Sequence, residues 1–295
     1  MKPYFEHMDE FGKELKAGRI KRAAESLAKL RETEAAIDSE KKKVEEVGFP
    51  TEKINARGWM TVWQRLEYLV DEGSWRPLHT LYNPLDNAEG TTNVVDGLAK
   101  IEGRWAVVIG FDNKFLAGAW LPGQSENILR VTNLAMRLNI PLVWLVNCSG
   151  AKLPEQEKFY ANRRGGGTPF FRHAELEQAG VPVLAGIWGT NPAGGGYQSI
   201  SPTILLAHKD ANIAVGGVGI VSGMAPRGGF DAEMLEEIIA KTKEFTGRPP
   251  GNVETHYDHT GFFSHVYEEE TGVLDGIKEY MRGIPAYAPK FFRVA

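Results

Sequence analysis

The sequence has very little cysteine: Cys148 is the single one among 295 residues. One cysteine cannot form an intramolecular disulfide, which excludes the small disulfide-stabilised secreted proteins. The sequence also lacks any apolar run near the ~20 residues that span a bilayer, and residues 1–7 show no signal-peptide pattern. We therefore expect a cytoplasmic protein.

An excess of basic charge is also missing. Lysine and arginine number 34 against 38 acidic residues, which gives a formal net charge of −4 and argues against a general nucleic-acid partner. Two phosphate-binding fingerprints are absent as well: neither G-x-x-x-x-G-K-[ST] nor G-x-G-x-x-G after a strand occurs. Nucleotide hydrolysis and nicotinamide binding therefore become less favoured. The apolar fraction of 42% is ordinary for a globular protein with a full core.

Hydrophobic periodicity predicts an α/β protein, because short apolar runs alternate with helical patterns between residues 104 and 225. We expect one or two helices at 9–47 and a helix at 61–70 with Thr61 as its N-cap. Residues 121–126 should open a helix that ends near 138. Further helices are expected near 171–179, at 231–246 and at 272–282. We expect strands at 104–110, 114–120, 141–148, 181–187, 203–207 and 212–215, with a hairpin turn at 110–113 and a loop at 83–96.

Two of these strands run into small residues. The strand at 141–148 leads into Ser149-Gly150-Ala151, and the strand at 181–187 leads into the run 189–197, which contains Gly194, Gly195 and Gly196. If the strands are neighbours, both loops lie at the carboxyl edge of the sheet, where open α/β sheets bind ligands. Two backbone N–H groups, one from each loop, would form an oxyanion hole. The structural alternative, that these glycines only let a helix pack close to a strand, is about equally favoured.

Arg163 and Arg164 precede three glycines, Gly165 to Gly167. Guanidinium groups beside bare backbone N–H groups are suited to bind a phosphate. A solvated surface loop has the same composition, and the sequence does not decide between the two.

Other candidate chemistry is weaker. His256, Asp258, His259 and His265 contain one metal-like spacing, but no cysteine or glutamate completes an obvious set, so we favour ordinary surface histidines and expect no metal. Ser149 lies outside a G-x-S-x-G pattern, and no base can be placed beside it or beside Cys148. We reject both as nucleophiles.

Five stretches carry a resemblance to a known family: 73–78, 116–120 with 122–124, 147–152, 162–171 and 189–197. The likeness runs over nearly the whole chain, to 291–294. On these stretches the chain resembles the amino-terminal half of the carboxyltransferase (α) subunits of glutaconyl-CoA decarboxylases. These are biotin-dependent acyl-CoA carboxyltransferases of the crotonase superfamily. The resemblance implies a crotonase (ClpP-like) spiral of ββα units, with an N-terminal helical segment over 1–75 and a CoA-ester-binding domain over 76–295.

The resemblance also implies a mechanism. A carboxylate passes from an acyl-CoA, with glutaconyl-CoA favoured, to biotin, and the remaining enolate is stabilised by backbone N–H groups of Ala151 and Gly194, with Gly195 as the near alternative. The same likeness assigns substrate contacts to Ser149, Gly150, Lys152, Arg163, Arg164, Gly165, Gly166, Gly196 and Tyr197.

The partners follow from the family. No biotinylation motif is present, so biotin would be carried by another protein, and the family implies a biotin carrier subunit, membrane decarboxylase subunits coupled to sodium export, and homo-oligomers. The chain would thus be peripheral to the membrane through its partners. Family subunits are about twice as long, and we expect the transfer to need a second crotonase-like half.

Three alternatives stay open. The first is a carboxylase of the same family that acts on propionyl-, methylcrotonyl- or acetyl-CoA. The second is a non-catalytic assembly domain that uses its N-terminal helices for docking. The third, a hydratase or thioesterase of the superfamily, is less favoured because no carboxylate pair stands beside the glycine loops.

Overall fold

The computed structural model describes residues 16–78, 90–160, 163–198, 201–214, 232–248 and 251–285. Its contacts divide the chain into two units, Met1–Lys43 and Val44–Ala295. The sequence-based division lay at residue 75 instead. The difference arises because helices α2 (Thr51–Asn55) and α3 (Val62–Leu69) bury Ile54, Leu66 and Leu69 in the second unit.

Helix α1 (Ala17–Glu46) is a single helix of 30 residues. Residues 9–15 of the predicted helical region lie outside the described residues. Its apolar side chains are mostly exposed, with Ile20, Leu27 and Leu30 about half accessible, and Val44 is its buried residue.

A seven-stranded sheet forms the centre of the second unit, in the order β1-β2-β3-β4-β5-β7-β9. The pairs β1–β2 and β2–β3 are antiparallel, and the pairs from β3 to β9 are parallel. A second sheet pairs β6 with β8 in parallel. The strands are β1 (Arg76–Pro77), β2 (Val94–Ile101), β3 (Arg104–Phe111), β4 (Leu142–Val146), β5 (Val183–Ile187), β6 (Thr190–Pro192), β7 (Ile204–His208), β8 (Asn212–Ala214) and β9 (His265–Tyr267).

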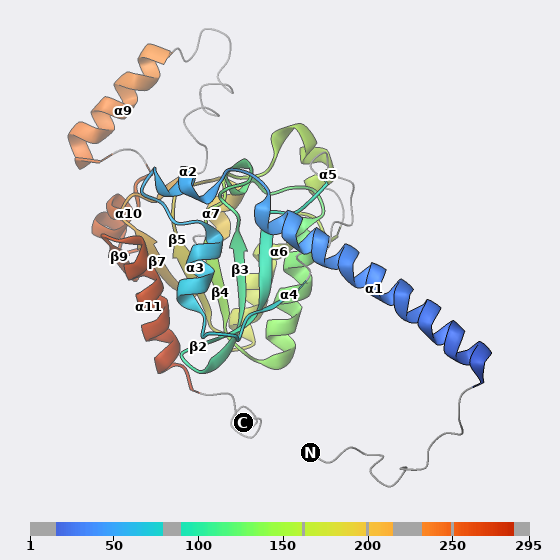
Figure 1. The fold of residues 1–295 in the computed structure, drawn as a ribbon. Helices are drawn as coiled ribbons and strands as arrows, with labels where there is room; N and C mark the ends of the chain where they lie inside the picture. The colour runs from blue at the N-terminus through green and yellow to red at the C-terminus, as the bar shows by residue number, and fades with distance from the viewer. Residues whose placement is uncertain are drawn as a thin grey trace. The chain divides into compact units, whose positions relative to one another are not determined.

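The large sheet has a hydrophobic core on each face. Along β3, Val107 and Ile109 point into one core, whereas Ala106 and Val108 point into the other, as the period-two geometry of a strand requires. Helices α4 (Gln124–Leu138) and α6 (Thr168–Gln178) cover the first face, and α3 and α11 (Glu270–Gly283) cover the second (Figure 1). Both faces are therefore apolar, which explains the continuous apolar runs of β4 and β5.

The predicted hairpin is wrong. Strand β3 pairs with β2, whose first residues, 94–96, fall within the expected loop, and the turn between the strands is Glu102-Gly103. Residues 116–118, expected in a strand, form a 3-10 turn (η1) with left-handed φ angles. The reason lies at Asp112, whose Oδ1 accepts the N–H of Lys114 at 2.9 Å and so bends the chain out of the strand.

The helix predictions agree well with the structure. Thr61 caps α3 with a capping box, because its side chain accepts the Gln64 N–H and the Gln64 side chain accepts the Thr61 N–H. The remaining helices are η2 (Leu153–Glu155), α5 (Gln156–Tyr160), α7 (Gly194–Gln198), α9 (Ala232–Thr246) and α10 (Val253–Thr260). None of the helices in the described ranges has the length and apolar composition needed to cross a bilayer.

Candidate functional site

The two predicted glycine loops leave neighbouring strands. Strands β4 and β5 pair in parallel from Leu142↔Val183 to Val146↔Ile187. The Trp188 N–H then donates to the Val146 carbonyl at 2.9 Å, which continues the pairing by one step. The exit loops of β4 (residues 147–151) and of β5 (residues 188–196) therefore begin side by side at the carboxyl edge of the sheet.

The exit loop of β4 is held by Trp120, which is fully buried. The Trp120 N–H donates to the Gly150 carbonyl at 2.8 Å, and the Trp120 carbonyl accepts the Lys152 N–H at 3.0 Å. Trp120 and Ala151 thus form a parallel bridge. In such a bridge the middle residue directs its own N–H to the opposite side. The Ala151 N–H therefore points away from Trp120.

The exit loop of β5 turns at Ala193, whose φ is 47°. Its N–H donates to the Ala214 carbonyl of β8 at 2.8 Å, so the second sheet supports this turn. Gly194 follows as the first residue of α7, where backbone N–H groups have no partner inside the helix.

Packing explains some of the glycines in this loop. A Cβ atom on Gly195 would lie 2.2 Å from the Cys148 carbonyl oxygen, and one on Gly196 would lie 3.1 Å from the Asn191 carbonyl oxygen. A Cβ atom on Gly194 would meet Phe170 at 3.6 Å, an ordinary contact. The structural interpretation therefore accounts for Gly195 and leaves Gly194 without a packing reason.

A strained turn supports the exit loop of β4. Leu116 and Ala117 have φ angles of 49° and 51°, which are unfavourable for residues with a side chain. The Ser149 hydroxyl donates to the Leu116 carbonyl at 3.2 Å, and the Ser149 N–H donates to the Ala117 carbonyl at 3.2 Å. Ser149, predicted as a substrate contact, thus holds this turn.

Four aromatic rings form a cluster that starts in the core: Trp120, Phe159, Phe170 and Tyr197. The Trp120 ring contacts Phe159 edge-on at 4.7 Å and Phe170 at 5.7 Å, and Phe170 stacks on Tyr197 at 4.5 Å. Tyr197 is 50% exposed. The cluster therefore leads from the buried core to an accessible aromatic ring beside Gly194.

The arginine–glycine loop leads into α6, the helix that carries Phe170. Arg163 and Arg164 are both exposed, and the Arg164 guanidinium makes an ion pair with Glu126 of α4. Glu126 also binds Arg130 at 3.0 Å. Gly166 has a packing role, since a Cβ there would lie 2.1 Å from the Phe159 ring.

Three further predicted residues are placed as follows. Gly150 is buried with a φ of 92°. Gly165 is buried, and its carbonyl accepts the Thr168 N–H at 3.1 Å. The Lys152 ammonium lies 2.8 Å from the Glu155 carboxylate.

The two rejected nucleophiles have different surroundings. Cys148 is completely buried, and burial raises the pKa of its thiol to about 12, which keeps it neutral at pH 7. The Ser149 hydroxyl is engaged with a backbone carbonyl, as described above. Neither side chain has the surroundings of an activated nucleophile.

The histidines considered for a metal lie on and after α10. Asp258 of that helix binds Arg248, and the His265 ring packs against Tyr267 at 4.6 Å. In the part of the chain that the structure describes, no group of three or more His, Cys, Asp or Glu side chains could hold a metal ion.

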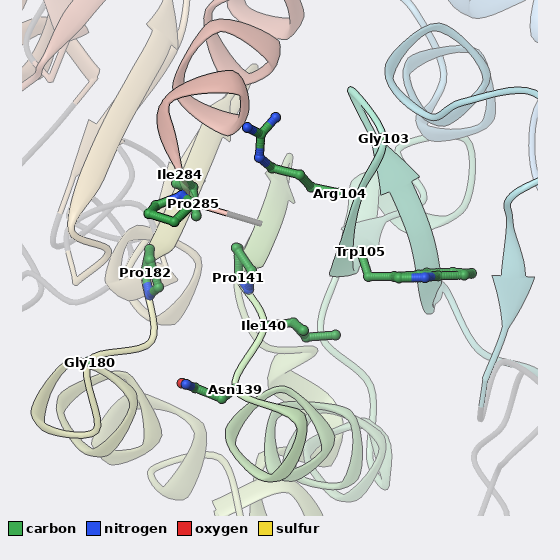
Figure 2. A pocket seen from close by; sticks show the side chains of 10 residues that line it. All are labelled: Gly103, Arg104, Trp105, Asn139, Ile140, Pro141, Gly180, Pro182, Ile284 and Pro285. Carbon is green, nitrogen blue, oxygen red and sulfur yellow. The ribbon is translucent and has the colours of Figure 1, made fainter. Parts of the chain in front are cut away.

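A separate cavity lies at the amino-terminal ends of β3, β4 and β5, opposite the ends from which the exit loops leave. Its volume is about 340 Å³, and Arg104 is the charged side chain among its lining residues. Figure 2 shows that these residues come from the turn before β3 and its first residues, from the segments before β4 and β5, and from the two residues that follow α11. The lining consists of Gly103, Arg104, Trp105, Asn139, Ile140, Pro141, Gly180, Pro182, Ile284 and Pro285. This cavity is distinct from the exit loops.

Two contributors to the candidate site, Asn191 and Trp120, were not predicted from the sequence. Asn191 belongs to the glycine-containing run 189–197, and its side chain joins the two loops: its Oδ1 accepts the Cys148 N–H at 2.8 Å. Trp120 was placed in a strand, whereas it bridges Ala151. An asparagine between Thr190 and Pro192 reads as a turn residue, so the sequence alone held no indication of this longer-range contact.

The chain resembles several known proteins in sequence and in fold. The chain is 52% identical over 296 residues to the glutaconyl-CoA decarboxylase subunit alpha of Acidaminococcus fermentans, covering 100% of this chain and 50% of that protein. It is 27% identical over 171 residues to the biotin-dependent 3-methylcrotonyl-coenzyme A carboxylase beta1 subunit of Mycobacterium tuberculosis, covering 56% of this chain and 32% of that subunit.

A solved structure, transcarboxylase 12S with methylmalonyl-coenzyme A and methylmalonic acid bound, superposes with a TM-score of 0.70 at 21% identity, covering 86% of this chain and 47% of that one. The crotonase-like carboxyltransferase fold expected from the sequence is thereby confirmed. The chain spans about half the length of these relatives or less.

The family model for the carboxyl transferase domain matches residues 53–295. The match begins at α2, inside the second unit, and runs through both exit loops. The chain therefore belongs to the carboxyl transferase domain family.

Proposed function

We propose that this chain binds an acyl-CoA and stabilises the enolate formed when the carboxylate of the acyl group is transferred to biotin. The observation that carries the proposal is the parallel pairing of β4 with β5, which starts both exit loops at one sheet edge. The 52% identity to a glutaconyl-CoA decarboxylase subunit favours glutaconyl-CoA as the acyl-CoA.

The proposed chemistry needs two N–H donors. When the bond between the acyl chain and its carboxylate breaks, which in glutaconyl-CoA is the bond at Cγ, its electron pair would move through the conjugated double bond to the thioester oxygen and form a dienolate. The N–H groups of Ala151 and Gly194, with Gly195 as the near alternative, would donate to that oxygen. Removal of one such donor typically costs about 10²–10³ in rate. No base is needed to form the enolate, because the breaking bond would supply the electrons. The proton displaced from the biotin ring nitrogen would balance the protonation of the enolate carbon.

Biotin would be carried by another protein and would supply the acceptor for the carboxyl group. The exit-loop edge fits such a co-substrate, because Tyr197 is 50% exposed and stacks on Phe170 beside Gly194. A biotin carrier subunit, membrane subunits, a homo-oligomer, a cytoplasmic location and a second half that completes the site are further parts of this proposal, drawn from family resemblance.

Phosphates of CoA would meet Arg163 and Arg164. Both side chains are exposed, and their loop leads directly into α6, whose Phe170 touches the exit loop of β5. The remaining predicted contacts of Gly150, Lys152, Gly165, Gly166, Gly196 and Tyr197 would line the same edge. Ser149 would act through its hydrogen bond to Leu116.

A matched pair of ligands tests this function. Butyryl-CoA carries the thioester oxygen, whereas the thioether S-butyl-CoA lacks it and is otherwise alike. Two neutral hydrogen bonds predict a preference of about tenfold for the thioester in calorimetric titration of the purified chain. Equal affinities would contradict the proposed oxyanion hole. Comparison of glutaconyl-CoA with crotonyl-CoA then tests the choice of acyl group.

A further inference from the structure

Asn191 joins the two exit loops through its side chain. It lies in β6 and is fully buried. Its Oδ1 accepts the Cys148 N–H of the first loop at 2.8 Å. Its Nδ2 donates to the carbonyls of Trp188 at 2.9 Å and Gly189 at 3.3 Å in the second loop.

The chemistry of these partners requires an amide. Two partners are carbonyl oxygens and need donors, and the third is an N–H and needs an acceptor. An asparagine side chain supplies both kinds of atom, whereas an ionised aspartate supplies acceptors alone. A carboxylate at this position would face two carbonyl oxygens inside a site without solvent, which is unfavourable.

The Asn191 side-chain bonds lie where the backbone pairing between β4 and β5 stops. Backbone pairing between β4 and β5 ends with the bond from Trp188 to Val146. Beyond that point the Asn191 amide continues the connection between the loops. The Asn191 backbone is itself fixed, since Asn191 pairs with Ile213 of β8. The side-chain amide therefore links the two loops from a backbone position that is fixed by the pairing with β8.

We propose that Asn191 is a positioning residue that sets the separation between the backbone N–H groups of Ala151 and Gly194. This inference rests on the proposed function. Cys148 stands three residues before Ala151, and Asn191 stands three residues before Gly194. The bond between Cys148 and Asn191 thus ties the two loops together at equal chain distance from the two donors. Asn191 would not touch the substrate itself and would act through the backbones of the two loops.

The test uses Asn191→Asp, which keeps the shape but replaces the amide donor by a second oxygen. That oxygen would face the Trp188 and Gly189 carbonyls, and the repulsion would move the side chain away from the Cys148 N–H. The readout is the ratio of butyryl-CoA affinity to S-butyl-CoA affinity in the full chain. We expect the ratio to fall from about tenfold to less than twofold, because both donors are misplaced. Affinity for S-butyl-CoA itself should change less than twofold, since that ligand uses no oxyanion hole. Amide hydrogen exchange at Cys148 should become faster, because the displaced carboxylate no longer accepts its N–H.

Asn113 supplies a matched control. It is 7% exposed, its Oδ1 accepts the Val62 N–H at 3.2 Å, and its Nδ2 donates to the Met60 carbonyl at 3.0 Å. Asn113→Asp should lower the melting temperature comparably and leave the thioester preference intact. If Asn191→Asp does not fold, Asn191→Ser replaces it, because serine is smaller and cannot span the same three partners.

The outcomes separate the two proposals. A wild-type preference that survives in Asn191→Asp or Asn191→Ser would overturn the positioning role and leave the proposed function standing. A preference that also disappears in Asn113→Asp would overturn the role too, because the effect would then be a general consequence of lost stability. A wild-type chain that binds both ligands equally would overturn the proposed function together with this inference.

Discussion

The Cys148 carbonyl oxygen occupies the space that a side chain on residue 195 would need, 2.2 Å from an ideal Cβ on Gly195. The neighbouring Gly194 has room, with Phe170 at 3.6 Å as the nearest contact. These adjacent glycines differ in their packing, which makes them a natural pair for mutation.

We expect Gly195→Ala to separate the exit loops and to lower the free energy of unfolding by about 1–3 kcal/mol, as overpacked sites do. The thioester preference over S-butyl-CoA should fall as well. Gly194→Ala keeps the backbone N–H and should retain both stability and preference. Urea denaturation and calorimetry measure the two effects. A Gly195→Ala variant as stable as Gly194→Ala would show that the loops tolerate a wider separation.

A buried ion pair joins α3 to α11. Arg65 is 1% exposed, and its Nε and Nη2 donate to the Glu270 carboxylate at 3.0 Å each. The guanidinium also lies over the Trp188 ring at 4.4 Å. Glu270→Gln leaves the Arg65 charge buried without its partner, so we expect a loss of about 3–5 kcal/mol in urea denaturation.

The double variant Arg65→Met with Glu270→Gln removes the buried charge. We expect it to be more stable than Glu270→Gln alone, because the desolvated guanidinium is gone. A double variant less stable than either single variant would mean that packing of Arg65 on Trp188, rather than charge, dominates this contact.

A buried histidine predicts a pH dependence of stability. His173 of α6 is 3% exposed and lies edge-on to Trp144 at 5.6 Å. Within the described residues neither ring nitrogen has a hydrogen-bond partner. Burial lowers the pKa of His173 from 6.5 to about 4, so the folded protein holds the ring neutral.

The direction in which stability changes with pH follows from proton binding. Between pH 6.5 and 4 the unfolded chain binds the proton and the folded chain does not, so stability falls as the pH is lowered through this window. The loss from this group approaches about 3 kcal/mol at its limit. His173→Phe should flatten this part of the stability profile, measured by urea denaturation from pH 4 to pH 7. An unchanged slope would mean that other groups cause the acid sensitivity.

The arginine loop predicts a salt-dependent affinity. Arg163→Ala with Arg164→Ala should weaken binding of butyryl-CoA about tenfold at low salt, and the loss should shrink as salt screens the phosphate charges. Arg130→Ala is the control, because Arg130 shares Glu126 with Arg164 but lies on α4. Calorimetry at two salt concentrations checks both. Equal losses in the control and the double variant would place the phosphates elsewhere.

Local patterns predicted the parts of the fold that depend on near neighbours. Thr61 was correct as an N-cap because its partner, Gln64, lies three residues away. The apolar runs that became β4 and β5 were recognisable because both faces of the strands are covered. Their adjacency was a conditional expectation, since sequence spacing does not specify which strands pair.

The failures involve contacts that are distant in sequence. Residues 114–120 have strand composition, yet the side chain of Asp112 turns the chain, and Trp120 pairs with Ala151 instead. Likewise, the link from Asn191 to Cys148 spans 43 residues, so no local rule could find it. The predicted donors of the candidate site have backbone roles, for which neighbouring glycines are a visible marker in the sequence.

The burial of Cys148 has a practical consequence. As the single thiol in the sequence, it lies in the exit loop of β4, completely covered and with its pKa raised to about 12. A thiol reagent can modify it only after this region opens, so the rate of labelling measures local opening of the β4–β5 edge. Cys148 can therefore report local opening of the exit loops without an added label site. A CoA ester that binds to both loops should slow the labelling of Cys148 by the thiol reagent.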